Sequence, residues 1–113
     1  MGNSISSLTS TVPDLTKALK TCEKVLAYAL KWSEVGPRTQ AALQKLTEAQ
    51  ENGASALAYA EYALKHKKNM LDKTPLDEAS AKMLLDDVNS GITEITAGGM
   101  LVKMEMKREN LSA

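Results

Sequence analysis

Apolar side chains recur along most of this sequence at alternating spacings of three and four residues, which places them on one face of an α-helix. The rhythm runs through three segments that are separated by strong helix breakers. Gly36-Pro37 supplies a C-cap glycine and a proline, and Thr74-Pro75 supplies a cap and a first-turn proline. The pattern therefore predicts three helices, over about residues 14–35, 37–72 and 75–109.

The residues expected in the core are mostly small or aliphatic, which predicts a thin core. In the first helix they are Leu15, Leu19, Cys22, Leu26 and Ala29. In the second helix they are Leu43, Leu46, Gly53, Leu57, Ala60, Leu64 and Leu71. In the third helix they are Ala81, Leu85, Val88, Ile92, Ile95, Gly99, Val102 and Met106.

Two glycine sites leave alternatives open within the long helices. Asn52-Gly53 is a turn dipeptide, yet the apolar phase continues across it, which favours a continuous or kinked helix. Residues 91–107 alternate like a strand, and Gly98-Gly99 could form a hairpin turn. The apolar phase again favours a helix. An alternative is that kinks near Gly53 and Gly98-Gly99 divide the long helices, which would give four or five shorter helices in all.

These elements predict an all-α fold, an elongated up-down-up three-helix bundle. The chain has 113 residues, enough for one domain, which we place at residues 14–110. A first helix of about 20 residues is about 30 Å long and the other two are about 50 Å. The first helix would then cover little more than half of the hairpin formed by the others, so we expect a homo-oligomer.

Composition excludes several functional classes. Fourteen basic and fourteen acidic residues cancel, which argues against a globally basic nucleic-acid binder. The single cysteine, Cys22, excludes an intramolecular disulfide and falls on the apolar stripe, while His66 is the only histidine. We find no catalytic constellation, no metal-ligand spacing and no cofactor motif, so we expect a non-enzymatic protein.

The N-terminus carries the one motif with functional content. Residues 1–13 are small and uncharged and read as a flexible tail. Met1-Gly2-Asn3-Ser4-Ile5-Ser6 fits the N-myristoylation template, in which the free amine of Gly2 accepts the acyl chain after Met1 is removed. A covalent myristate on Gly2 is therefore expected if the source is a eukaryote or a virus of eukaryotes. In a bacterial protein the motif would carry no meaning, because bacteria lack the transferase.

A basic edge follows this motif. One myristoyl chain binds membranes only marginally, so a second signal is needed. Lys17, Lys20, Lys24 and Lys31 follow one edge of the first helix and could contact an anionic membrane surface. The competing interpretation is an ordinary solvated helix face. A second basic cluster, Lys65 to Lys68 with His66, is interpreted as compensation of a helix dipole.

Two functions fit this sequence. The first is an N-myristoylated, self-assembling scaffold at the cytoplasmic face of a membrane, peripheral and attached through Gly2. Its size, acylation motif and helical content are similar, at the level of class, to matrix proteins of enveloped viruses, although the strong basic face of retroviral matrix domains is missing. The alternative is a soluble helical module for protein interaction, such as a chaperone, effector or assembly subunit, in which Gly2 is incidental.

Overall fold

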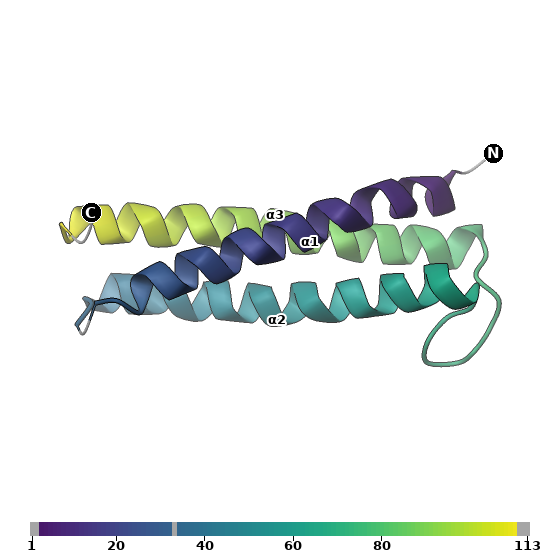
Figure 1. Ribbon diagram of the computed structural model, residues 1–113, viewed down its shortest axis with the longest axis horizontal. Helices are drawn as coiled ribbons and strands as arrows, with labels where there is room; N and C mark the ends of the chain where they lie inside the picture. The colour runs from purple at the N-terminus through teal and green to yellow at the C-terminus, as the bar shows by residue number, and fades with distance from the viewer. Residues whose placement is uncertain (1–2, 33, 111–113) are drawn as a thin grey trace.

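The computed structural model describes residues 3–32 and 34–110 and consists of three helices, of which the second runs antiparallel to the first and the third (Figure 1). These are α1 (Ser4–Ala29), α2 (Pro37–His66) and α3 (Glu78–Arg108). They pack into a rod with principal extents of 50 × 24 × 18 Å. The prediction of an all-α, up-down-up three-helix bundle is confirmed.

Helices α2 and α3 lie side by side as a long hairpin, and α1 packs across both of them (Figure 1). The start of α1 lies beside α3, and its end lies toward α2. Among the described residues the core is a continuous cluster of small and aliphatic side chains from all three helices, including Leu8, Leu15, Leu46, Val88 and Val102.

The first helix begins ten residues earlier than predicted, so the assignment of residues 4–13 to a flexible tail is wrong. Leu8 is fully buried and anchors this segment to the core. The hydroxyl groups of Thr9 and Thr11 donate to the carbonyl oxygens one turn earlier, Ile5 and Ser7 (2.8 and 2.6 Å). These hydroxyl groups therefore find partners within the helix, which continues through Pro13.

The longer first helix also changes the expected coverage. Its 26 residues span about 39 Å, against about 45 Å for the 30 residues of α2. The hairpin is therefore covered along most of its length, and the half-exposed hairpin from which we expected an oligomer does not form. Self-association remains a prediction, but an uncovered hairpin no longer supports it.

The other helix ends differ from the predicted ones by several residues. Helix α1 ends at Ala29 rather than near residue 35, and α2 ends at His66 because Lys67 adopts a left-handed conformation (φ 59°). Residues 67–77 form a loop. Helix α3 begins after a capping box in which the Ser80 N–H donates to Asp77 (2.8 Å) and the Asp77 N–H donates to Ser80 (3.1 Å).

Both long helices run unbroken through their glycines, so the hairpin alternative for residues 91–107 and the division into shorter helices are wrong. Gly53 and Gly91 face each other where α2 and α3 approach closely. A Cβ atom on Gly91 would lie 3.4 Å from the Gly53 Cα and 3.4 Å from the Leu15 Cδ1. The glycines thus allow close backbone contact, and Leu15 packs over both.

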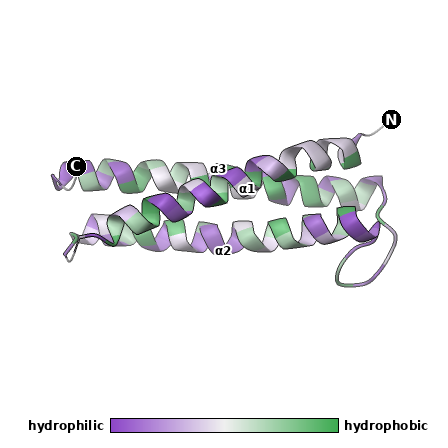
Figure 2. Ribbon diagram, in the orientation of Figure 1, coloured by the Kyte–Doolittle hydropathy of each residue, from purple (hydrophilic) through white to green (hydrophobic). Residues whose placement is uncertain are grey.

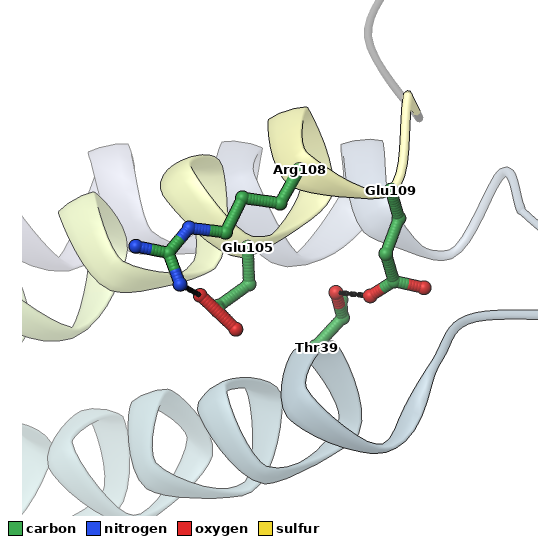
Figure 3. A network of polar contacts seen from close by, with 4 residues as sticks. All are labelled: Thr39, Glu105, Arg108 and Glu109. Carbon is green, nitrogen blue, oxygen red and sulfur yellow. Dashed lines mark hydrogen bonds and ion pairs between the residues drawn. The ribbon is translucent and has the colours of Figure 1, made fainter.

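Carboxylates at the two ends of α3 cap the N-termini of the other two helices. Within the described chain, neither α1 nor α2 has an N-cap hydrogen bond from its own N-cap side chain. Glu78 accepts hydrogen bonds from the Ser4 N–H (3.1 Å) and hydroxyl. At the other end of the bundle Glu109 accepts from the Gly36 N–H and the Thr39 hydroxyl (Figure 3). A negative charge at each site complements the positive end of a helix dipole.

The Glu109 cap gives a testable expectation for stability. Glu109→Ala removes the acceptor for two groups, and we expect the free energy of unfolding to fall by about 1–2 kcal/mol. Denaturant titration measures this value. Glu94→Ala removes the same charge from an exposed position of α3 and serves as the control, with a change below about 0.5 kcal/mol. Equal effects of both changes would show that Glu109 acts only through net charge.

Candidate functional site

The start of α1 lies at the end of the bundle that also carries the α2–α3 loop (Figure 1). We call this end the N-terminal pole; it comprises residues 3–5, the loop at residues 67–77 and the first residues of α3. The predicted acylation site, Gly2, lies outside the described residues. The contact between Ser4 and Glu78 fixes the first described turn to the start of α3. An acyl group on Gly2 would therefore be attached at this pole.

The four lysines predicted as a basic edge lie on the solvent side of α1 and the turn that follows it. We call them the lysine row: Lys17, Lys20, Lys24 and Lys31. All four are exposed, while Leu15, Cys22 and Ala29 on the opposite face are buried. Figure 2 shows hydrophilic turns on the outward face of α1. The row spans residues 17–31, and its two ends are about 21 Å apart at helical rise.

No acidic side chain interrupts this row. Asp14 and Glu23 are the only acidic residues of α1, and they lie on either side of the row by helical phase. Within the described residues the one ion pair joins Arg108 to Glu105 (3.2 Å), far along α3, and no ion pair involves the row (Figure 3). Lys31 lies over the ring of Tyr28, 5.5 Å from its centroid. The row is thus an exposed line of four cations, flanked by two carboxylates, that can contact an anionic partner.

An open groove between α1 and α3 was not predicted. It has a volume of about 330 Å³, with Val25 and Ile95 in its apolar wall and Lys17 and Lys103 among the residues that line it. A Cβ atom at Gly99 would meet no described atom within 4 Å. The gap therefore arises where small residues of the two helices face each other, a feature that sequence periodicity alone does not resolve.

Cys22 also lines this groove but is almost fully buried, in agreement with the prediction of a core thiol. Burial raises the pKa of Cys22, and the nearby Glu23 carboxylate adds to the rise. A raised pKa keeps the thiol protonated at neutral pH, and the thiolate is the reactive form. The geometry therefore offers no activated nucleophile at this position.

The second basic cluster lies at the N-terminal pole. The His66 ring lies against the Tyr62 ring in a tilted contact, with centroids 4.4 Å apart and an interplanar angle of 42°. Lys73 donates to the Tyr62 hydroxyl (2.9 Å), and this hydrogen bond lowers the pKa of Tyr62. Leu71, predicted as a core residue of the second helix, is instead 80% exposed in the loop. The prediction from apolar spacing is wrong for this residue, because the spacing continues by coincidence beyond the end of α2.

The described part of the chain holds neither a candidate metal site nor a candidate membrane span. There, no three His, Cys, Asp or Glu side chains are grouped so that they could hold a metal ion. No helix among the described residues is both long and apolar enough to span a bilayer. Comparison with known protein families, curated proteins and solved structures finds no match to this chain.

Proposed function

We propose that this protein is a non-enzymatic, N-myristoylated helical scaffold that associates with the cytoplasmic face of a membrane and self-assembles there, in the manner of a viral matrix protein. The observation that carries the proposal is the lysine row. The row is exposed along α1 and the turn that follows it, with Asp14 and Glu23 on either side, and α1 begins two residues after Gly2. The myristoylation template and this row would supply the two signals that stable membrane attachment requires.

The energetics of the two signals are complementary. A single myristoyl chain binds a bilayer marginally and reversibly. Each lysine near an anionic leaflet adds about 1 kcal/mol, so the four residues could add up to about 4 kcal/mol, or roughly a thousandfold in affinity. The row holds its four charges on one rigid face, which allows several of them to approach a planar surface together.

The fold also places a condition on acylation. The transferase needs Gly2 and the residues after it in a flexible, extended form that can enter its groove. In the folded protein the chain is helical from Ser4, and Leu8 is fully buried. Acylation would therefore have to precede the folding of α1, and we expect the transferase to act during synthesis rather than on the folded bundle.

The first experiment measures acylation directly. The chain is produced in cells together with N-myristoyltransferase, beside a Gly2→Ala variant, and the intact masses are determined. The proposal predicts loss of Met1 and gain of one myristoyl group in the parent chain, and no myristoyl group in Gly2→Ala. An unmodified N-terminus in the parent chain would remove the main support for membrane scaffolding.

The lysine row is tested on the acylated protein. Charge reversal of Lys20 and Lys24 to glutamate should weaken binding to anionic vesicles by at least about tenfold. The matched control reverses Lys45 and Lys107, which are exposed on α2 and α3. Equal losses in the two double variants would show that only net charge matters and that the row is not the contact surface.

The alternative function, a soluble module for protein interaction, draws on a different surface. Met100 and Met104 are exposed on α3, and methionine side chains adapt to varied partners. Met106, predicted as a core residue of the third helix, is buried. Tight binding of a partner protein by an unacylated chain that ignores vesicles would favour this alternative.

A further inference from the structure

Helix α3 carries two stripes of side chains at alternating spacings of three and four residues, on opposite faces of the helix. The first stripe includes Val88, Ile95 and Val102 and is buried in the core. The second is exposed along its whole length, and we call it the outer stripe: Met83, Asp86, Ser90, Thr93, Ala97, Met100, Met104 and Lys107. This spacing places its members in line, as in a helix that packs along another helix.

Half of the large hydrophobic side chains that the described bundle exposes lie on the outer stripe. Six such side chains are exposed, and three of them are Met83, Met100 and Met104. The stripe residues between Asp86 and Met100 are small or short, which would let the backbone of a second helix approach closely. The stripe therefore has the composition of a packing face, although no element of the described chain covers it.

The exposed charges of α3 are separated along its length. Before Gly98 the helix has one exposed base, Lys82, and four exposed acids: Glu78, Asp86, Asp87 and Glu94. After Gly98 it has three exposed bases: Lys103, Lys107 and Arg108. The one acid of α3 in that part, Glu105, is 5% exposed and paired with Arg108 (3.2 Å). The solvent side of α3 is thus acidic toward its start and basic toward its end.

This order of charges is complementary to a second copy of α3 that runs antiparallel to the first. In such a pair, residues at equal distances on either side of the two-fold axis face each other. With the axis beside Ala97, Asp87 faces Lys107 of the second copy, because each lies ten residues from Ala97. Ser90 likewise faces Met104, since each lies seven residues away. A parallel pair would instead set acids against acids.

We propose that the outer stripe is a self-association surface, through which two copies of this chain pair by their α3 helices, antiparallel about Ala97. The inference rests on the self-assembly in the proposed function and assigns a surface to it. The methionines of each copy pack over the short side chains of the other, because the flexible thioether chain fills irregular gaps. The lysine row of α1 is excluded as a self-contact, since it would set four lysines against four.

This pairing keeps the two lysine rows on one side of the dimer. The outer stripe lies between the flank of α3 that faces α1, with Thr96 and Lys103, and the flank that faces α2, with Glu94 and Leu101. The two-fold axis of an antiparallel pair is perpendicular to the plane of the two α3 helices, so rotation about it does not exchange the two sides of that plane. Both α1 helices therefore lie on the same side, where both rows can face one planar surface.

The contact is small, so we expect a weak dimer. At helical rise the stripe is about 36 Å long, and two single helices that pack along this length bury less than the roughly 800 Å² per partner of a stable complex. The expected dissociation constant is about 10–100 μM. Such a dimer would form mainly where attachment to a membrane concentrates the chain.

The test measures self-association of the unacylated full chain by sedimentation equilibrium, from low micromolar concentrations to about 500 μM. One double variant reverses acids of the stripe, Asp86→Lys with Asp87→Lys. The second reverses bases, Lys103→Glu with Lys107→Glu. Each variant alone should dimerise at least about tenfold more weakly than the parent chain, because like charges meet at both ends of the pair.

An equal mixture of the two variants should restore dimerisation, because opposite charges then meet at both ends. Restoration also shows that both variants are folded. The matched control, Glu51→Lys with Glu61→Lys, makes the same change of charge at exposed positions of α2 and should leave the dissociation constant unchanged. A control that weakens dimerisation equally, or a mixture that restores nothing, would overturn the outer stripe as the contact surface.

Disulfide cross-linking tests the orientation of the pair. With copper phenanthroline as the oxidant, Ala97→Cys should form a cross-linked dimer, while Ser90→Cys should not, because its two copies lie about 21 Å apart along the pair. Cys22 gives little background, since it is 1% exposed. Equal cross-linking at the two positions would indicate a parallel pair and overturn the proposal.

The result separates this surface from the membrane function. A chain that stays monomeric at 500 μM would overturn the outer stripe as a self-association surface, and binding of the acylated monomer to anionic vesicles would leave membrane attachment intact. A chain that pairs as described while its acylated form ignores vesicles would support the stripe and reject the membrane function.

Discussion

Replacing Leu15 by alanine should lower the free energy of unfolding by about 3 kcal/mol, a large part of the stability of a domain of this size. Leu15 is fully buried at the point where all three helices meet. Its Cδ1 atom would lie 3.4 Å from a Cβ atom on Gly91 and 3.6 Å from one on Gly53. Because α2 and α3 already touch through these glycines, they cannot move closer to fill the space left by the leucine.

Denaturant titration followed by far-ultraviolet circular dichroism measures this loss. Leu30→Ala removes the same atoms from a side chain that is 84% exposed, and we expect a change below about 0.5 kcal/mol. A loss below about 1 kcal/mol for Leu15→Ala would mean that the site collapses around the smaller side chain, and that the junction is looser than the structure indicates.

Gly53→Leu should be similarly damaging, with an expected loss of about 3 kcal/mol from overpacking. Even a Cβ atom at this position would lie 2.7 Å from the Ile95 Cδ1 and 3.4 Å from the Leu19 Cδ2. The added side chain would have to separate α2 from α3 or displace α1. Either movement would expose core surface on more than one helix.

The matched control for Gly53→Leu is Gly99→Leu. Among the described residues, no atom lies within 4 Å of a Cβ atom at Gly99, so the leucine would enter the groove between α1 and α3. A gain in helix propensity should then leave stability unchanged or raise it by about 0.5–1 kcal/mol. If the two variants lose equal stability, the close approach of α2 and α3 at Gly53 and Gly91 is not the reason that Gly53→Leu is destabilising.

Much of the fold follows from the apolar periodicity. The 3-4 spacing is a global property of each helix, so it identified three helices and kept its phase through Gly53 and Gly98-Gly99, where local propensity alone favours a turn. It also placed Leu15, Cys22, Val88 and Val102 in the core. Because the phase reflects which face is buried, it outweighed the turn preference of single glycines.

The sequence failed where tertiary contacts decide the outcome. Residues 4–13 look like a tail because they lack charge and strong periodicity, yet the burial of Leu8 and the bond from Ser4 to Glu78 hold them in a helix. Leu71 fits the stripe of α2 but lies beyond the left-handed Lys67. Contacts between residues more than seventy positions apart, such as Glu109 with Gly36, leave no local signal in the sequence.

The candidate surface was partly predictable for the same reason. Exposure of the lysine row follows from its helical phase opposite the apolar stripe, and the structure finds all four residues on the solvent side. The shared pole of the N-terminus and the α2–α3 loop could not be predicted in detail, because it depends on where α1 begins and on the turn that displays Leu71.

Flotation of the acylated chain with vesicles tests the membrane account most directly. The protein is produced together with the transferase and floated with vesicles that contain one third phosphatidylserine, at low and high salt, beside Gly2→Ala. We expect the acylated chain to float at low salt, to float less at high salt as the lysine row is screened, and Gly2→Ala to remain at the bottom of the gradient. An acylated chain that stays at the bottom with Gly2→Ala would contradict the account and direct the search to protein partners.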